Sequence, residues 1–236
     1  MPLKLKDIDN EIMLSDKRIP VCFRWNYRAK RLVLRIDRKN RGLIITIPKF
    51  ATLSDARAFI ETEKTWILCE LSKIPNLIPF EPGVNIPILG ETYLVCHAPN
   101  CRGGVWIKDK NLYVSGRPEH LARRLQDWLR KEAKRIIRVN VEKKIKLLNL
   151  NLGRIIIKDT KTRWGSCSAE GNLNFSWRIL LMPPNVFDYI ITHEVAHLAH
   201  HNHGPNFWAL VRDIDPTFNQ AKSWLKKNGD NLHRYG

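Results

Sequence analysis

The sequence lacks every long apolar run that a membrane helix would need. It contains no stretch of about 18 consecutive apolar residues, so we expect no transmembrane helix and no membrane partner. Its first residues, 1–7, also lack the apolar centre of a secretory signal peptide. These absences together predict a cytoplasmic protein.

Cysteine is scarce as well. The five cysteines are scattered along 236 residues and odd in number, which argues against a disulfide framework. Cys96 and Cys101 stand close in sequence, but no second Cys or His pair lies near them to complete a metal site. The sequence also has no glycine-rich phosphate-binding loop of the kind that many nucleotide-binding proteins use.

Acidic residues are outnumbered by basic ones. The chain has 40 Lys and Arg against 23 Asp and Glu, a net charge of +17. Such a charge attracts polyanions, so nucleic acid, nucleotides and acidic proteins are candidate partners. Basicity alone does not choose among them, and a solvated basic surface with no specific partner has the same composition.

What the sequence does contain is His-Glu-x-x-His, at His193, Glu194 and His197. On a helix, residues four apart share one face, so both imidazoles can reach one zinc ion at about 2.0–2.1 Å. Glu194 would lie beside the metal, where it can take a proton from a zinc-bound water. The pair Pro183 and Pro184 suits the start of this helix.

A catalytic zinc usually has three protein ligands. On a continuous helix, His200 and His201 would lie about 10–12 Å along the axis from His193, too far to converge on the same ion. His203 has an asparagine before it and Gly-Pro after it, residue types that end helices. The chain can therefore turn back there, which favours His203 as the third ligand.

Other third ligands stay open. Glutamate is excluded because none follows Glu194. Asp213 and Asp215 are alternatives, although Asp215 precedes a proline and suits a helix cap equally well. The ligand spacing equals that of metzincins, but His200 stands where their turn glycine is required and no Met-turn is evident. We therefore do not predict a metzincin.

The hydrophobic pattern predicts an α+β protein, with a strand-rich N-terminal part followed by a core with a small sheet. The His-Glu-x-x-His helix in that core is the motif of zincin-like metallopeptidases, and this motif rather than the hydrophobic pattern indicates that class. We expect one domain over residues 1–116 and a second over 117–236, with a loosely held arm over 1–19. Strands are expected over residues 21–27, 31–37, 43–48, 91–96, 105–108, 111–114, 154–158 and 173–181. Helices are expected over residues 54–71, 118–150, 206–211 and 216–227, besides the one that begins near 184. The basic face of residues 118–150 is either a nucleic-acid surface or a solvated helix face.

Several short motifs resemble the YgjP-like metal-dependent hydrolase family, a group of zinc metallopeptidases similar to SprT-like proteases. They are Arg163-Trp164-Gly165-Ser166-Cys167-Ser168, Leu173-Asn174-Phe175, His193 to Leu198, Asn202-His203 and Phe207-Trp208. The resemblance covers most of the chain, with Phe175 where a Trp is common and Gly204-Pro205 closer to the SprT-like pattern. It implies zinc ligands at His193, His197 and His203 and a catalytic Glu194.

The leading hypothesis is a zinc-dependent metallopeptidase acting on a peptide or protein. Glu194 would activate a zinc-bound water and then protonate the leaving amine. Trp164 and the strand around Asn174 would bind the extended substrate. The alternatives are a metal-dependent nucleotide phosphohydrolase, and a nucleic-acid-associated protein with a structural zinc site. Arg163, Tyr189, His200 and His201 are unranked candidates for stabilising the oxyanion.

Overall fold

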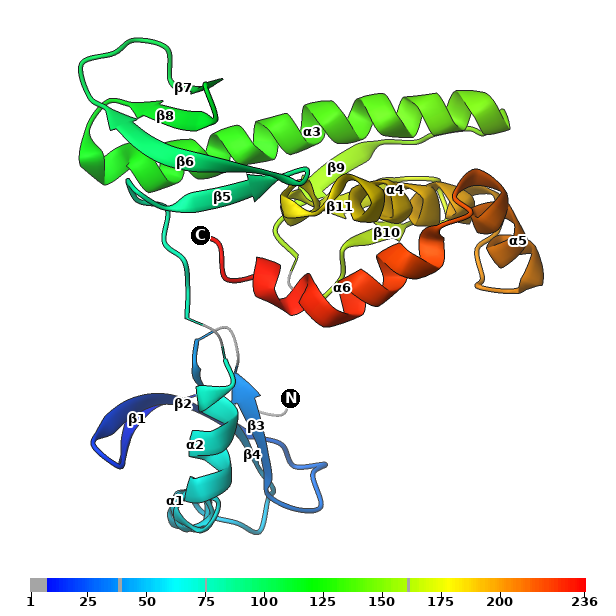
Figure 1. The fold of residues 1–236 in the computed structure, drawn as a ribbon. Helices are drawn as coiled ribbons and strands as arrows, with labels where there is room; N and C mark the ends of the chain where they lie inside the picture. The colour runs from blue at the N-terminus through cyan, green and yellow to red at the C-terminus, as the bar shows by residue number, and fades with distance from the viewer. Residues whose placement is uncertain (1–7, 38–39, 75, 161) are drawn as a thin grey trace. The chain divides into compact units, whose positions relative to one another are not determined.

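The computed structural model describes residues 8–37, 40–74, 76–160 and 162–236. The chain divides into two compact units, Met1–Asn76 and Leu77–Gly236, called here the N-terminal and C-terminal units. Strands and helices are mixed in both (Figure 1), and the sheets are concentrated before residue 120. Within the described residues, no helix is both long enough and apolar enough to cross a membrane.

The N-terminal unit is a four-stranded sheet with two helices. Its strands are β1 (Ile8–Leu14), β2 (Lys17–Trp25), β3 (Val33–Asp37) and β4 (Gly42–Ile47), and its helices are α1 (Leu53–Thr62) and α2 (Lys64–Ser72). The strand order is β1-β2-β4-β3. The central pair, β2 and β4, is parallel, whereas β1 and β3 are antiparallel to their neighbours.

Alternation in β2 explains which face the helices cover. Ile19, Val21 and Phe23 are buried, whereas Arg18 and Arg24, which flank this run on the opposite face, are exposed. The buried face packs with apolar residues of β4 and with the inner sides of α1 and α2 into one core. The period of two along the strand thus separates an apolar face from a basic one.

Two expectations for this unit need correction. Residues 8–19, expected as a loose arm, form β1 and the start of β2, while residues 1–7 lie outside the described part of the chain. The single helix expected over 54–71 is interrupted at Glu63, and its cap is Thr52 rather than Ser54. Thr52 accepts a hydrogen bond from the Asp55 amide and its own amide donates to the Asp55 carboxylate, a capping box.

The C-terminal unit combines two small sheets with four α-helices. The first sheet contains β5 (Asn85–Ile88), β6 (Glu91–Ala98), β7 (Val105–Lys108) and β8 (Asn111–Ser115), in the order β5-β6-β8-β7. The second contains β9 (Ile155–Lys158), β10 (Gly165–Cys167) and β11 (Leu173–Ser176), in the order β10-β11-β9. The α-helices are α3 (Leu121–Leu148), α4 (Pro184–Ala199), α5 (Pro205–Ile214) and α6 (Phe218–Leu232).

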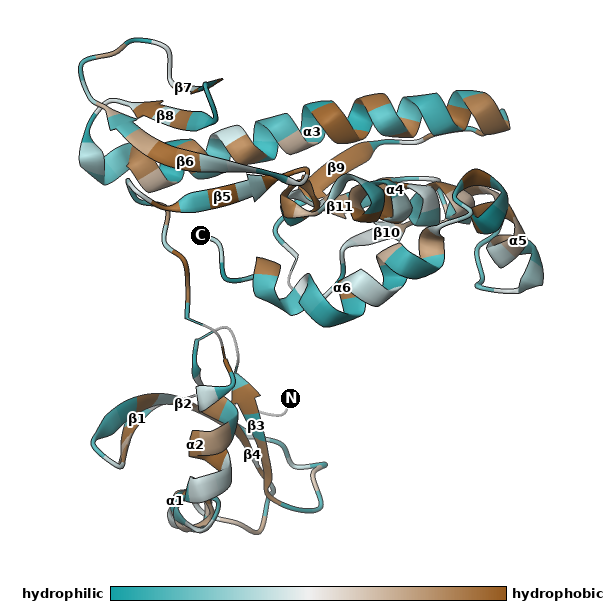
Figure 2. Cartoon of the chain, viewed as in Figure 1, coloured by the Kyte–Doolittle hydropathy of each residue, from teal (hydrophilic) through white to brown (hydrophobic). Residues whose placement is uncertain are grey.

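Helix α3 joins these parts around one core. Its buried residues recur every four positions, and they are Leu121, Leu125, Leu129, Ala133, Ile137 and Val141. The helix contacts β7 and β8 of the first sheet, β9 of the second sheet, and α4. Figure 1 shows α3 running alongside these elements. The alternation of hydrophobic and hydrophilic colour along α3 in Figure 2 shows the same amphipathic pattern.

This shared core explains why the compact units differ from the expected division after residue 116. Residues 77–116 carry apolar side chains, such as Ile86, Val95 and Leu112, that join the same cluster as α3 and α4. A short 3₁₀ turn, Pro118–His120, does interrupt the chain near the expected boundary. It is a bend within one unit, and the division falls between Asn76 and Leu77.

The expected strand over 173–181 is shorter than predicted. Strand β11 ends at Ser176, and Trp177–Leu181 form a fully buried 3₁₀ turn. The Ser176 hydroxyl accepts a hydrogen bond from the Arg178 amide and so caps this turn. The turn leads directly into the start of α4.

Arg178 carries a buried charge within that turn, with 2% of its side chain exposed. Its guanidinium pairs with Asp159, donates to the Tyr235 carbonyl at 3.1 Å and lies 4.4 Å from the Trp177 ring centroid. Asp159 also accepts from Arg130 at 3.1 Å. Burial raises the pKa of Asp159, but the two guanidiniums outweigh it and the net pKa is lowered from 3.8.

Replacing Asp159 with asparagine should destabilise the C-terminal unit by about 3 kcal/mol, the low end of the usual cost of removing one partner of a buried ion pair, because it leaves the buried Arg178 charge unpaired while Asp159 itself is 31% exposed. In the wild type, a lowered pKa means that ionised Asp159 stabilises the fold near neutral pH. That contribution is lost as the pH falls through the lowered folded-state value. Urea unfolding of Asp159→Asn and of the exposed control Asp127→Asn at pH 7 and in acid measures both effects. Equal stability of the two variants at pH 7 would contradict the prediction.

Candidate metal centre

Helix α4 provides the scaffold of the candidate site. Pro184 occupies its first turn, and ten of its residues, most of them apolar, are buried. This fixes the helix against α3 and α6. His193, Glu194 and His197 follow on its inner side, with 5% of Glu194 and 9% of His197 exposed.

The chain turns back after α4 and brings His203 next to His193, but this turn begins earlier than the sequence suggested. Helix α4 ends at Ala199, and His200 is already extended, with φ −135° and ψ 105°. His203 Nε2 lies 3.0 Å from His193 Nε2. Ligand atoms of His193, His197 and His203 all lie within 4.8 Å of one another. Two nitrogens bound tetrahedrally to one zinc would be about 3.3 Å apart, so the cluster has the dimensions of a metal site.

The protonation of the imidazoles also fits metal binding. Burial, followed by the charges of His197 and His203, lowers the pKa of His193 to about 4. Burial likewise lowers the pKa of His197, whose Nδ1 lies 3.0 Å from the His200 carbonyl oxygen. If Nδ1 donates there, Nε2 is left as the metal-binding atom. The set consists of neutral nitrogen donors, which suit zinc.

Other expected ligands do not join this cluster. Among the described residues, the only group of three or more potential ligands within reach of one ion is His193, His197 and His203. Asp215 instead accepts hydrogen bonds from the Thr217 amide at 3.0 Å and the Thr217 hydroxyl at 2.8 Å. These bonds hold a local turn between α5 and α6. They are not the side-chain helix cap expected from the sequence, since the N-cap of α6 is Thr217 and receives no side-chain cap bond.

Glu194 lies beside the histidines and under strand β10. Burial raises the pKa of its carboxyl to about 8, and the nearby Arg163 opposes that shift. A Cβ atom on Gly165 would come within 2.5 Å of Glu194 Cγ and Oε1. Only a glycine leaves room for the carboxylate at this point of the strand.

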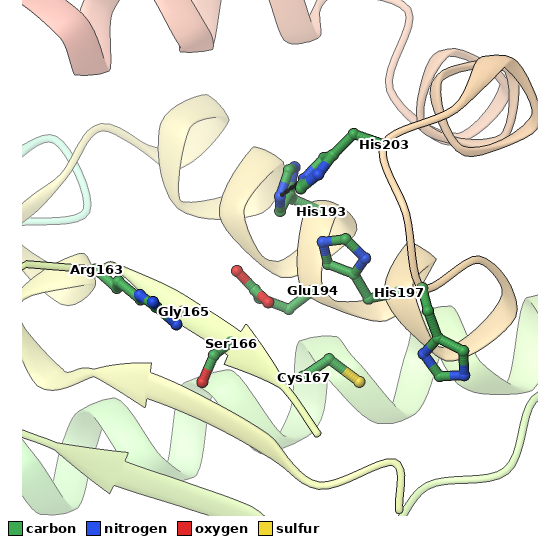
Figure 3. Close-up of a pocket in the computed structure, with 9 residues that line it drawn as sticks. Arg163, Gly165, Ser166, Cys167, His193, Glu194, His197 and His203 are labelled. Atoms are coloured by element: carbon green, nitrogen blue, oxygen red, sulfur yellow. Dashed lines mark hydrogen bonds between the residues drawn. The ribbon is translucent and has the colours of Figure 1, made fainter. Parts of the chain in front are cut away.

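A cavity of about 340 Å³ opens over these groups (Figure 3). Its walls come from β10 and the residue before it, from α4, and from the turn that follows α4. The lining residues are Arg163, Gly165, Ser166, Cys167, His193, Glu194, His197, His201 and His203. The volume lies at the small end of the range for ligand pockets, about 300–1,000 Å³.

Phe207 of α5 supports the histidines from behind. It is fully buried, and its ring centroid lies 5.0, 4.6 and 4.8 Å from those of His193, His197 and His203. The same phenyl ring thus contacts all three candidate ligands. Phe207 therefore packs against the turn that carries His203.

The two expected substrate-binding residues do not line the cavity. Trp164 stacks on His233, with ring centroids 4.6 Å apart. The Asn174 amide donates to the Ser166 hydroxyl at 3.3 Å, and its buried Oδ1 has no hydrogen-bond partner. Direct contact of either side chain with substrate remains a prediction that this arrangement does not support.

The sequence analysis did not predict that residues of β10 line the cavity. Gly165, Ser166 and Cys167 belong to the Trp-Gly-Ser-Cys-Ser motif, whose presence was the available signal. Of the unranked oxyanion candidates, Arg163 and His201 line the cavity and His200 does not. Tyr189 is buried, and its ring lies edge-on to His193 at 5.9 Å.

A model of the family described as YgjP-like, metallopeptidase domain, matches residues 30–228. The chain belongs to the YgjP-like metallopeptidase family. The match includes all three candidate ligands, Glu194 and β10, and it spans both compact units. No curated protein matches this YgjP-like chain significantly.

Two solved structures are similar to part of this YgjP-like protein, and both are described as metallopeptidase zymogens. Jannalysin of Methanocaldococcus jannaschii is 23% identical with a TM-score of 0.36, over 39% of this chain and 95% of jannalysin. Abylysin of Pyrococcus abyssi is 22% identical with a TM-score of 0.36, over 42% of this chain and 97% of abylysin.

Proposed function

We propose that this YgjP-like protein is a zinc-dependent metallopeptidase. His193, His197 and His203 would hold the ion, and Glu194 would act as the general base. The observation that carries the proposal is the convergence of three imidazoles beside a buried carboxylate at the floor of an open cavity. Family membership supports the peptidase class.

The ligand set favours a catalytic site over a structural one. Three protein ligands leave one coordination position open, whereas structural zinc sites have four. That position would face the cavity. A bound zinc would supply Lewis acidity there, lowering the pKa of a water ligand and polarising the scissile carbonyl.

Glu194 has the properties of a proton carrier in amide hydrolysis. Its carboxylate would take a proton from the attacking water and return it to the leaving amine. A carboxyl group whose pKa is raised by burial holds that proton more readily than an exposed one. Gly165 and the buried side of α4 leave the carboxylate little freedom to move away.

Strand β10 offers a binding edge for an extended substrate. In the described part of the sheet it pairs only with β11, through Gly165↔Phe175, Ser166↔Asn174 and Cys167↔Leu173. All three residues of β10 line the cavity, so a peptide backbone bound there could add to its other edge as a further strand. Asn174 would then act indirectly, by holding Ser166 in the strand.

Metal content tests the ligand assignment. We expect about one zinc per chain in the purified wild type by plasma mass spectrometry, and a large loss in His203→Ala, because two ligands hold zinc much less tightly than three. His201→Ala is the matched control, since His201 lines the same cavity but lies outside the ligand cluster. A wild type that takes up no zinc on reconstitution, or equal zinc in both variants, would contradict the proposal.

Substrate screens separate peptidase from phosphohydrolase activity. Zinc-loaded protein is tested on an unstructured protein, on peptide libraries and on nucleoside triphosphates with added Mg²⁺. The proposal expects cleavage of amide bonds. Hydrolysis of triphosphates alone would favour the nucleotide alternative.

A further inference from the structure

Charge in the N-terminal unit is unevenly distributed along the chain. Residues 17–54 contain eleven Lys and Arg but one acidic residue, Asp37. The other acidic residues of the described unit lie on the β1–β2 hairpin or from the capping box of α1 onward. The excess of positive charge is therefore concentrated on the sheet and its loops.

Strand topology brings part of this segment together at one edge. Because β2 and β4 are parallel neighbours, both end at the same edge, with Trp25 paired to Ile47. Strand β3 lies beyond β4 and starts at this edge, with Val33 paired to Thr46. The loop of residues 26–32 must therefore cross the end of β4. A hydrogen bond of 2.9 Å from the Asn26 amide to the Ile47 carbonyl fixes that crossing.

Six exposed residues gather there, called here the aromatic–basic edge. They are Tyr27, Arg28, Lys30, Arg31, Lys49 and Phe50. Tyr27 is 54% exposed and Phe50 is 75% exposed, which is unusual for large aromatic side chains. In the described part of the chain, no ion pair neutralises any of the four cations. The nearest following acid, Asp55, is held by Thr52 at 2.8 Å.

We propose that the aromatic–basic edge binds single-stranded nucleic acid. Unpaired cations contact phosphates, and exposed aromatic faces stack on bases that are not already stacked in a duplex. An anionic lipid surface would attract the same charges, but peripheral insertion usually requires the continuous apolar face of an amphipathic helix. The residues of this edge lie in turns, and only two of them are apolar enough to insert.

The structure gives the edge a fixed frame. The turn at residues 26–29 is closed by an Ala29 amide to Asn26 carbonyl bond of 2.9 Å, and the Arg28 amide donates to the Asn26 side chain at 3.0 Å. The chain after β4 is closed by the Ala51 amide to Pro48 carbonyl bond of 3.2 Å. Both aromatic residues are thus presented from ordered turns, which lowers the entropy cost of stacking. Neither the metal nor Glu194 takes part, so the proposal does not depend on the peptidase assignment.

Fluorescence anisotropy with the full chain and labelled 15-nucleotide dT and rU oligomers tests the proposal, with a hairpin duplex for comparison. Arg28, Lys30, Arg31 and Lys49 are replaced together by alanine. The matched control replaces Arg123, Lys131, Lys134 and Lys143 of α3 by alanine. These four residues are also exposed, and their replacement lowers the net charge by the same amount. We expect at least a tenfold loss in the edge variant and less than threefold in the control. The slope of log affinity against log salt should fall by about 3 in the edge variant.

The aromatic residues are tested separately. Tyr27→Leu with Phe50→Leu keeps apolar volume but removes the stacking faces, so affinity for the oligomers should fall about tenfold or more with the salt slope unchanged. Tyr27→Trp with Phe50→Trp should restore it. Equal losses in the edge and α3 variants, unaltered binding by the leucine variant, or duplex bound as tightly as single strands would overturn the proposal. Preference for anionic vesicles over oligomers, or no oligomer binding at low salt, would overturn it too.

Discussion

Replacing Glu194 with glutamine should lower kcat for peptide hydrolysis by about 10²–10⁴-fold, the usual contribution of a general base. Glutamine has the same shape but cannot accept the proton of the attacking water. The variant should retain zinc, because the carboxylate is not one of the clustered ligands. The measurement pairs steady-state kinetics with the zinc content of the same preparation.

The control for this experiment is Glu170→Gln. Glu170 is an exposed carboxylate in the turn between β10 and β11, and it does not line the cavity. It loses the same charge and should keep wild-type kcat. If Glu194→Gln keeps both its zinc and its turnover, Glu194 is not the general base.

Replacing Gly165 with alanine should lower kcat about 10²-fold or more through a different route. The added Cβ would lie 2.5–2.6 Å from Glu194 Cγ, Oε1 and Cδ, closer than real Cβ contacts occur. Either Glu194 or strand β10 must shift, and a misplacement of about 1 Å can cost this much. Zinc content should stay near that of the wild type, because the three atoms nearest to the new methyl group belong to Glu194 and not to a candidate ligand.

Gly229→Ala is the matched control. Its Cβ would meet Leu225 and Trp164 at 3.4 Å, an ordinary contact, and alanine favours the helix α6 in which it lies. We expect wild-type kcat from this control. A crystal structure of Gly165→Ala with Glu194 in its original place, or wild-type kcat with intact zinc, would show that the close approach does not position the base.

Helix α4, which carries the candidate ligands, could be predicted from the sequence because its signals are local. The proline pair, the apolar flanks and the His-Glu-x-x-His spacing all act within a few turns of α4. The end of the helix at Ala199 was harder to predict, since nothing local in the sequence forces His200 into an extended conformation. The close approach of Gly165 to Glu194 could not be predicted from the sequence either, because tertiary packing brings together two residues that are far apart in the chain.

The compact units divide after residue 76 rather than at the expected residue 116 for a related reason. Gly116 has φ +89° and the next residues form a 3₁₀ turn, so the local break is real. Whether a break separates units depends on what the buried stripe of α3 packs against, and no local pattern reports that. Strand β1 lacked a clear local signal as well. Ser15 and Asp16, with φ 47° and 61°, form the two-residue turn of its hairpin, but this pair is not one of the glycine-containing pairs that usually mark such a turn.

The two ends of the C-terminal unit meet. Ile78 and Tyr235 form a parallel bridge, with the Ile78 amide donating to the Arg234 carbonyl at 2.8 Å and the Gly236 amide donating to the Ile78 carbonyl at 3.1 Å. A unit whose ends are adjacent is a natural candidate for circular permutation and for insertion into a host protein. A short linker joining residues 236 and 77 would let new termini be opened in an exposed turn, such as that between β7 and β8. The C-terminal unit, with α4 and the candidate ligands, could then be inserted into a host protein without the N-terminal unit.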